Sequence, residues 1–406
     1  QDVTLYYIVQ KGSENDTIQK LLQHYEDLSD HIKVEQKDPD LYPKFTSQYT
    51  DQTVAANSVI VVCGDKSKVV SNSDMWESST NYQTYQTQTT GFDGEGQITS
   101  AITYVTSENN PKVYWVTGHG EASESDLSTN FSDAINKNNV EISDLALMTD
   151  DIPEDAEELV IMSPTTDFSE DEANKVITYL ENGGKLLMFT SYTGTDMPNL
   201  DSILENYGVK RSSGIVVETD SQHYYPQMPY YLLPNIQSDN ITTEVKSNYI
   251  LMPVAQAIQK LDSYRDTITI KSLLTTTEDA YIENDPENST WSKSADSETG
   301  AFDLGVSITE TVDDKETQII YFSSASMLSS QIDQAISGAN SKLAATALTS
   351  MCDVEQTVVI PSKSTSYTNL VFTQGAVNTW SIITIAGIPL VLVVIGVMIW
   401  LKRRKQ

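Results

Sequence analysis

The chain has 406 residues, of which 39% are hydrophobic, enough for two or three folded domains and unlike the composition of a disordered stalk. Its 57 acidic residues outnumber 25 basic ones, for a formal net charge of −32. Such a surface repels phosphate backbones, which excludes nucleic acid as a partner. Two cysteines, Cys63 and Cys352, provide neither a disulfide framework nor a C-x-x-C motif, and the sequence leaves open whether they pair.

The first 72 residues have the pattern of a small α/β module. Apolar residues recur at helical spacing after Asn15, and Gly64 and Asp65 form a turn signal between two β-rich runs. The β-α-β, then β-β order predicts a thioredoxin-like fold. Residues 10–13, where a thioredoxin carries its redox cysteines, contain none, so that chemistry is not expected. Strands are expected at 2–10, 31–35, 58–63 and 66–70.

A linker is expected between this module and the next, over residues 73–110. Residues 71–92 are rich in Ser, Thr, Asn, Gln and Tyr and show little periodicity, which predicts a long loop. A short helix is expected from Gly94 to Thr106.

A second α/β domain, with additions, is expected over residues 111–360. Up to Thr219 strand and helix patterns alternate, which predicts right-handed β-α-β units and a parallel sheet covered on both faces. Ser169 with Glu172 forms a capping-box signal. Strands are expected at 112–117, 140–147, 158–162, 185–190 and 209–219, with helices at 125–139, 169–182 and 199–207. Past Asp220, strands are expected at 243–248, 268–275, 301–308 and 317–322, a helix or strand at 251–259, a polar excursion at 278–300 and a helix at 339–352.

A candidate site follows the first strand of this domain. Gly118, His119, Gly120 and Glu121 lie past the carboxyl end of a predicted parallel strand, where open α/β sheets bind ligands. His119 could carry a proton or bind a metal with Glu121 as its partner, but a tight structural turn explains the same pattern. Ser163, after the strand at 158–162, would lie beside this loop, although no G-x-S-x-G elbow surrounds it.

A second candidate is an aromatic, Pro-rich loop that could grip a glycan or peptide, or simply pack together. Its aromatic residues are Tyr224, Tyr225, Tyr230 and Tyr231. The other histidines are scattered, and the sequence contains no G-x-x-x-x-G-K-[ST]. We therefore predict no metal site and no cofactor, and any ATPase must be a separate subunit.

The C-terminus predicts a membrane-spanning helix over residues 380–401. Residues 381–401 contain no charge, and about 20 apolar residues cross a bilayer core of ~30 Å. Trp380 and Trp400 fit the two interfaces, and the basic tail at 402–406 marks the cytoplasmic side. The Ser/Thr/Asn-rich residues 361–379 are expected to form a stalk. The bulk of the chain should then be extracytoplasmic, which requires an exporting segment upstream of Gln1.

Several stretches, in one order along nearly the whole chain, resemble the GldG family, the auxiliary subunit encoded with some ABC-2-type bacterial transporters and named from gliding motility. They are Val3 to Val9, Gly91 to Glu95 with Thr99 to Ile102, Val113 to Glu121, Ile152 to Ala156, Tyr179 to Lys185 and Asn340 to Leu343. The resemblance implies a bacterial membrane-anchored extracytoplasmic protein, with a permease and an ATPase as partners. It also implies that the middle domain has a flavodoxin-like sheet similar to class I glutamine amidotransferases.

Three functions fit these observations. The first is a non-enzymatic transporter subunit that contacts the permease and also cargo or the cell envelope. The second is a hydrolase or amidotransferase-like enzyme that uses His119, Glu121 and Ser163 on an envelope substrate. The third is an anchored glycan-binding module. A hydrogen bond between His119 and Ser163 at an open pocket would favour the second, and exposed, stacked Tyr230 and Tyr231 would favour the third.

Overall fold

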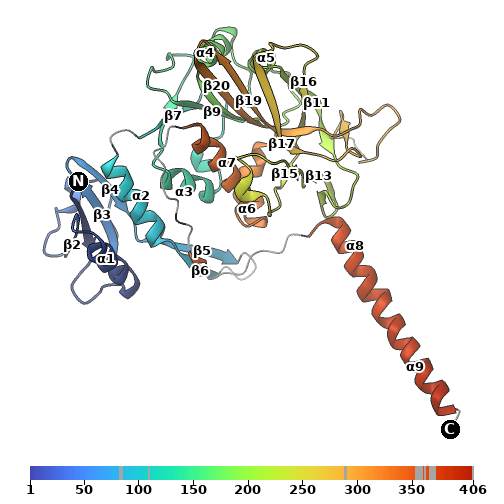
Figure 1. The fold of residues 1–406 in the computed structure, drawn as a ribbon, viewed down its shortest axis with the longest axis horizontal. Helices are drawn as coiled ribbons and strands as arrows, with labels where there is room; N and C mark the ends of the chain where they lie inside the picture. Colours follow the sequence, from blue (N-terminus) through green and yellow to red (C-terminus); the bar gives the residue numbers. More distant parts are fainter. Residues whose placement is uncertain are drawn as a thin grey trace. The chain divides into compact units, whose positions relative to one another are not determined.

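A computed structural model describes residues 1–81, 86–107, 110–287, 290–352, 360, 363–364 and 372–404 (Figure 1). Internal contacts divide the chain into two units. The first comprises Gln1–Val113, Ser132–Ser143 and Cys352–Thr368, and the second comprises Tyr114–Phe131, Asp144–Met351 and Asn369–Gln406. No disulfide joins Cys63 to Cys352.

The first unit contains the predicted β-α-β, then β-β module. The sheet has the order β2-β1-β3-β4, in which β1 is parallel to β2 and the other pairs are antiparallel. The Asn15 side chain caps the helix by accepting from the N–H groups of Thr17 and Ile18. Ile18 and Leu22 turn inward onto the sheet. The elements are β1 (Val3–Ile8), α1 (Asp16–Leu28), β2 (Ile32–Lys37), β3 (Ser58–Cys63) and β4 (Lys66–Val70).

The stretch predicted as a loop at 71–92 instead forms a hairpin. Strand β5 (Trp76–Asn81) pairs antiparallel with β6 (Gln86–Phe92), and residues 82–85 lie outside the described residues. Threonine is common in this stretch and favours strands. A strand made of polar residues shows no hydrophobic periodicity, so the periodicity did not indicate it. Part of the predicted stalk joins this sheet, because β21 (Lys363–Ser364) pairs with β6. The stalk positions 361–362 and 365–371 lie outside the described residues.

The expected helix after the hairpin is present as α2 (Gly94–Thr106), and it packs on the first unit's core through Ile98 and Ala101. Glycine is required at its start, because a Cβ on Gly94 would overlap the Phe92 ring. The Gly91 to Glu95 stretch is thus explained by close packing.

The second unit is organised around a mixed sheet. The sheet includes two strands, Lys112–Val116 and Glu141–Leu145, through which the division between the units passes. Strand order is β18-β11-β16-β19-β20-β10-β9-β7-β8, with β17 beside β19 and β14 beside β17. The parallel prediction is correct for β9, β10 and β20, whereas β19, β17, β16, β11 and β18 pair antiparallel. The strands are β7 (Lys112–Val116), β8 (Glu141–Leu145), β9 (Glu158–Met162), β10 (Lys185–Phe189), β11 (Val209–Val217), β14 (Asn235–Ile236), β16 (Gln256–Lys260), β17 (Ile268–Thr275), β18 (Tyr281–Glu283), β19 (Asp303–Val312) and β20 (Lys315–Phe322).

The antiparallel pairing of β19 with β20 arises from a short connection that the strands expected at 301–308 and 317–322 did not indicate. Asp313 and Asp314 have φ angles of 50° and 62° and link β19 directly to β20. A two-residue loop with positive φ at both positions closes an antiparallel hairpin, whereas parallel strands need a long crossover. The parallel pattern already ends after β10, because β11 pairs antiparallel with β16 and β18, and of the later described strands only β20 returns parallel to β10.

Helices cover the sheet on both sides (Figure 1). Residues of α4 and α5 pack against alternate residues of the central strands, and α7 lies on the other side of the sheet. The predicted capping box of α4 is confirmed, since Ser169 and Glu172 bond reciprocally. The helices are α3 (Thr129–Lys137), α4 (Glu170–Glu181), α5 (Pro198–Asn206), α6 (Ser330–Ala335) and α7 (Ala339–Met351).

Three predictions past Asp220 need correction. The strand expected at 243–248 is a 3-10 turn over Thr243–Val245, because Asp239 and Thr242 side chains bond to nearby backbone. The excursion at 278–300 contains β18 and a bridge between Tyr281 and Thr299. The aromatic loop is a small sheet of β12 (Tyr224–Tyr225), β13 (Met228–Leu232) and β15 (Met252–Pro253).

The C-terminal segment is one continuous apolar helix over Gln374–Arg404, long enough to cross a membrane. It comprises α8 (Gln374–Ile382), a π-helical turn (Ile383–Gly387) and α9 (Ile388–Arg404). The Ile388 N–H donates to Ile383, five residues back, just before Pro389. Proline crowds the carbonyl four residues before it, which explains the widened turn. Lys405 lies outside the described residues.

Candidate functional site

The candidate loop at 118–121 lies at the topological switch point of the sheet. From β7 the chain passes to β8 on one side and then crosses to β9 on the other side of β7. Open α/β sheets bind ligands in the crevice that such a reversal opens at the carboxyl ends of the strands. The loops after β7 and β9 would form that crevice here, and they carry His119 and Ser163.

The two loops are joined directly by backbone hydrogen bonds. The His119 carbonyl accepts hydrogen bonds from the N–H groups of Thr165 and Thr166, at 2.9 and 3.1 Å. The Ala122 N–H donates to the Met162 carbonyl at 2.9 Å. Gly120 has a φ of 77°, and a Cβ there would overlap the Oγ1 of Thr165. Glycine at this position is therefore required both for its backbone conformation and for close contact between the loops.

The His119 side chain fills the space beneath these loops. It is 5% exposed, and its ring lies 4.4 Å, centroid to centroid, from that of Phe168. Its Nδ1 is 3.4 Å from Oε1 of Glu121, and its Nε2 is 3.3 Å from Oε2 of Glu172. Both carboxylates are nearly inaccessible to solvent. The three side chains therefore form a buried cluster of ionisable groups, in which Nδ1 of His119 and Oε1 of Glu121 make no hydrogen bond to a described residue.

Each carboxylate is also tied to backbone. Glu121 accepts from the His119 N–H at 2.7 Å, and Glu172 accepts from the Ser169 N–H and hydroxyl at 2.9 and 2.7 Å. Burial raises the pKa of Glu172, but the Ser169 hydrogen bonds and the His119 charge outweigh it and leave that pKa below its ordinary value. The cluster therefore anchors the first turn of α4 to the loop after β7.

Ser163 is bonded to residues other than His119. Its backbone has a φ of 54°, its N–H donates to the Phe189 carbonyl, and its hydroxyl donates to Ser191 Oγ at 2.8 Å. In the described part of the chain no hydrogen bond joins Ser163 to His119. The structure brings the loops of both predicted residues to one edge without assembling a nucleophile and base.

Glu172 and Phe168 are partners of His119 that the sequence pattern does not indicate. In the sequence Glu172 is a capping-box residue, and nothing in its spacing relates it to a histidine far earlier in the chain. The signal available was positional, because a helix that begins after β9 must start beside the loop that follows β7. Within the described ranges, no group of three or more His, Cys, Asp or Glu side chains is placed to hold a metal ion.

Comparison with known protein families shows to which family the chain belongs. A family model described as an ABC-type uncharacterized transport system, an auxiliary component, matches residues 110–350, more than half of the chain. The chain belongs to this family. The matched residues contain the whole His119 cluster and most of the large sheet. The resemblance predicted from the sequence is thereby confirmed at the level of an ABC transport auxiliary component.

Other comparisons add little to the family. The search of curated proteins gave no match. Among solved structures, the mmIFT52 N-terminal domain is similar at 15% identity and a TM-score of 0.43, covering 59% of this chain and 96% of that one. A putative ThuA-like protein from Parabacteroides merdae matches at 12% identity and a TM-score of 0.33, with 66% and 99% coverage. The exo-beta-1,4-mannosidase Op5Man5 from Opitutaceae bacterium strain TAV5 matches at 10% identity and a TM-score of 0.31, with 66% and 38% coverage.

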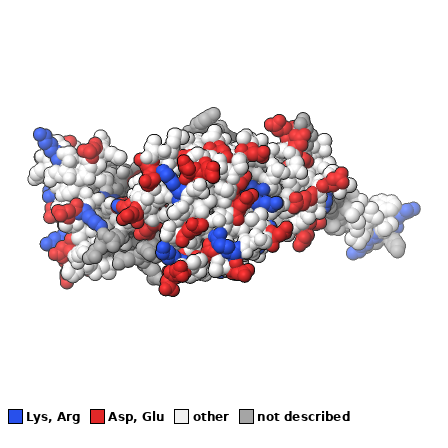
Figure 2. Space-filling view, turned by 90° about the horizontal axis from the view of Figure 1, so that it is seen from above, with Lys and Arg blue, Asp and Glu red and all other residues white. Residues whose placement is uncertain are grey.

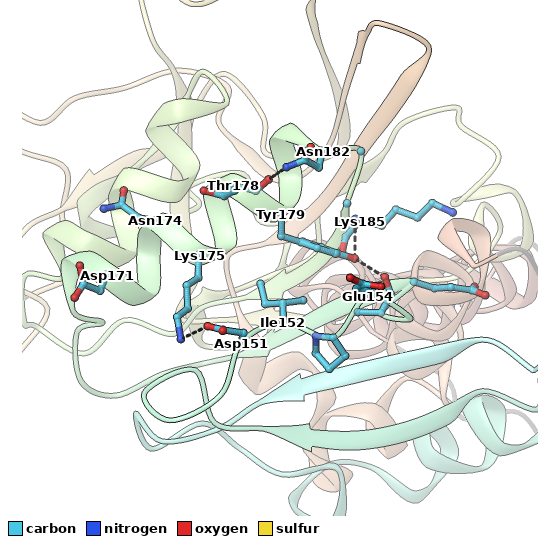
Figure 3. A pocket seen from close by; sticks show the side chains of 15 residues that line it. Asp151, Ile152, Glu154, Asp171, Asn174, Lys175, Thr178, Tyr179, Asn182 and Lys185 are labelled. Atoms are coloured by element: carbon cyan, nitrogen blue, oxygen red, sulfur yellow. Dashed lines mark hydrogen bonds and ion pairs between the residues drawn. The ribbon is translucent and has the colours of Figure 1, made fainter.

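A hollow of about 1080 Å³ lies at the opposite edge of the family domain, beside the start of β9 and β10 and along α4 (Figure 3). Lys175 spans part of it, with an ion pair to Asp151 at 3.0 Å. The Tyr179 hydroxyl lies within hydrogen-bond distance of the Ala156 and Lys185 carbonyls and accepts from the Lys185 N–H. The Tyr179 hydroxyl therefore joins two of the stretches that carry the family resemblance, Ile152 to Ala156 and Tyr179 to Lys185.

The four tyrosines of the second candidate lie on the β12–β13 hairpin, and all are half-buried. Tyr230 and Tyr231 meet edge-on at 72° and not as a stacked pair, and the ring of Trp291 lies 4.4 Å from that of Tyr230. The exposed, stacked pair that would favour sugar binding is not formed.

Proposed function

We propose that the chain is a non-enzymatic, membrane-anchored auxiliary subunit of a bacterial ABC transporter. Its folded units would lie outside the cytoplasm, and it would contact the permease and, with its outer surface, cargo or the cell envelope. One observation carries the non-enzymatic part. The crevice in which this fold class binds ligands is occupied by the protein's own His119 cluster and closed by hydrogen bonds between its two loops.

The C-terminal helix supports membrane anchoring. Its most apolar window has a mean hydropathy of 2.9, and none of that window is buried against the rest of the chain. Lys402, Arg403 and Arg404 follow the apolar run, and a basic cluster at a helix end favours the cytoplasmic side. Figure 2 shows acidic side chains scattered over the visible face, with basic ones at the helix tip. A strongly acidic surface suits solvent outside the membrane.

The helix is also the surface that we propose for contact with the permease. Ala386, Gly387 and Gly396 are small, and small residues let membrane helices approach closely. The ATPase would be a separate subunit that this chain reaches only through the permease.

Affinity purification of the detergent-solubilised chain from its native membrane tests the partners, with mass spectrometry of what co-purifies. We expect a permease and an ATPase. The matched control replaces residues 381–401 with an unrelated membrane helix of equal length, and loss of the permease in that control would assign the contact to the helix. Purification of the native chain without either subunit would contradict the proposal.

Orientation can be tested in intact cells with a membrane-impermeant maleimide. Cys63→Ser with Cys352→Ala provides the background, and Met148→Cys and Lys402→Cys supply single reporters. Met148 is 70% exposed and follows β8. We expect labelling of the cysteine at 148 and protection of the one at 402 until the cells are permeabilised. The reverse pattern would place the folded units in the cytoplasm.

A further inference from the structure

The C-terminal helix is fastened to the β12–β13 hairpin. The Gly375 N–H donates to the Ser221 carbonyl at 2.7 Å, and the Gln227 N–H donates to the Gln374 side chain at 3.0 Å. Thr373, the N-cap of α8, donates to the Gln222 side chain at 3.1 Å. Figure 1 shows α8 leaving the second unit beside β13. These contacts fix the hairpin at the point where the helix begins.

The hairpin is also unusual in composition. Although the chain carries 57 acidic residues, no Asp, Glu, Lys or Arg occurs from Ser221 to Ser238. The same is true from Ser364 to Leu401, which includes the helix. An acidic segment at this place would meet the headgroups of a lipid surface and would lose hydration there. The two segments that meet at the junction are thus the ones that a bilayer surface tolerates.

The side chains of the hairpin suit an interface between water and lipid. Met228 is 38% exposed at the start of β13, and the four tyrosines are half-buried. Tyr230 adds the indole of Trp291 to this group. Tyr and Trp rings combine an apolar body with a polar atom, and membrane proteins concentrate them in the headgroup layer.

The helix geometry sets the height of the hairpin above the hydrocarbon. Ser381, where the uncharged apolar run begins, lies six residue positions after Gly375. At 1.5 Å per residue this distance is about 9 Å. The headgroup region extends roughly 5–8 Å beyond the hydrocarbon core on each side, so the hairpin lies at its outer boundary.

We propose that the β12–β13 hairpin is a membrane-contact element, which rests its tyrosines and Met228 on the headgroup layer of the bilayer that the C-terminal helix spans. It would hold the second unit at a fixed height and tilt above the membrane. This inference rests on the anchoring proposed above. It replaces a sugar or peptide as the partner of the aromatic loop, because the Tyr230 ring already contacts the Trp291 ring, tilted by 32°.

The test places a fluorophore at three single cysteines of the full chain, reconstituted in phosphatidylcholine vesicles. The background is again Cys63→Ser with Cys352→Ala. Met228→Cys reports on the hairpin, and Met148→Cys is a control of the same residue type on the same unit, 70% exposed. Val394→Cys reports on the helix within the bilayer. Each is labelled with an environment-sensitive fluorophore, and quenching by headgroup-labelled and chain-brominated phosphatidylcholine is compared.

We expect strong headgroup quenching and a blue-shifted emission at 228, no quenching at 148, and quenching by brominated chains at 394. Equal, weak quenching at 228 and 148, with 394 still quenched, would overturn the hairpin proposal while leaving the anchor intact. Absence of quenching at 394 would instead remove the anchoring on which the proposal rests. The two failures are therefore distinguishable.

A length change in the helix gives a second, independent test. Seven alanines inserted between Ala376 and Val377 add two helical turns, which preserves the facing of the unit and raises it by about 10 Å. The hairpin itself is untouched. Headgroup quenching at 228 should fall to the level seen at 148, while the quenching at 394 remains. Quenching at 228 that is unaffected by the insertion would contradict the fixed junction.

Discussion

Two places in the second unit show opposite uses of polar and apolar residues. At the carboxyl edge of the parallel strands, His119, Glu121 and Glu172 are ionisable, and all three side chains are buried. At the β12–β13 hairpin the chain lacks charged residues, yet Met228 and the tyrosines reach the surface. The ionisable residues, whose type suggests a reactive site, are buried in the fold. The uncharged aromatic and apolar residues, whose type suggests a core, reach the surface.

The two places should therefore differ in what a substitution changes: the free energy of unfolding at the first, and contact with lipid at the second. Removing one member of a buried cluster of ionisable groups leaves the others without a partner, whereas changing an exposed residue costs little. If the first place is structural and the second is a contact surface, substitutions at the first should lower the free energy of unfolding. Substitutions at the second should change only the relation to lipid.

The largest effect is expected for His119→Leu. Without the imidazole, the carboxylates of Glu121 and Glu172 stay buried beside an apolar side chain, and leaving a buried polar group without its partner costs about 1–3 kcal/mol, more for a charged group. Urea unfolding of the detergent-solubilised chain measures this loss. His223→Leu is the control, because among the described residues the His223 ring bonds to the Leu233 carbonyl alone, and its loss should cost about 1 kcal/mol. Equal losses for the two variants would show that the His119 cluster has no special weight.

Gly120→Ala should follow in size. Alanine there meets both a φ of 77° and the Oγ1 of Thr165, and strained backbone alone costs about 1–3 kcal/mol. Gly118→Ala is the matched control, since Gly118 also has a positive φ but its Cβ would meet no atom within 4 Å. Thr165→Ala should recover part of the Gly120→Ala loss in a double-mutant cycle. Without such coupling, the contact between the two loops would not matter to stability.

A smaller effect is expected from acid. Because the folded-state pKa of Glu172 is lowered, the unfolded chain binds the proton more tightly. Its contribution to stability is therefore present above the unfolded pKa, about 4.3, and is lost as pH falls through the folded value. Unfolding free energies measured from neutral pH to pH 3 should fall less steeply for Glu172→Gln than for the native chain. Parallel curves would indicate that the carboxylate is not stabilised by its partners.

Much of the architecture could be predicted from local signals. The Ser169–Glu172 capping box gave the start of α4, Asn15 gave the start of α1, and the uncharged run after Trp380 gave the terminal helix. These predictions succeeded because each rests on neighbours within one helical turn or on composition alone. The Asp313 and Asp314 turn was equally local, but its positive φ values are less specific to Asp than to Asn-Gly or Gly.

The candidate site was harder to predict because its meaning depends on partners distant in sequence. The sequence of the Gly118 to Glu121 loop is compatible with two environments for His119, an open crevice or a buried pair of carboxylates. Only the start of α4, which supplies Glu172, decides between them. The same applies to Asn340 and Ser341, whose side chains bond to Leu251 and Asp333 inside the fold. Buried hydrogen bonds between remote segments leave no periodicity in the sequence.

The smallest effect on stability, and the sharpest contrast with the His119 cluster, is expected for Met228→Glu. A substitution at an exposed position usually changes the free energy of unfolding by less than about 0.5 kcal/mol, and Met228 is 38% exposed. In vesicles, however, the added charge should lift the hairpin from the headgroups, and quenching of a fluorophore at Gln227→Cys should fall. Met228→Leu should preserve both stability and quenching. If Met228→Glu instead destabilised the chain as much as Gly120→Ala, the hairpin would be part of the core and not a surface for lipid.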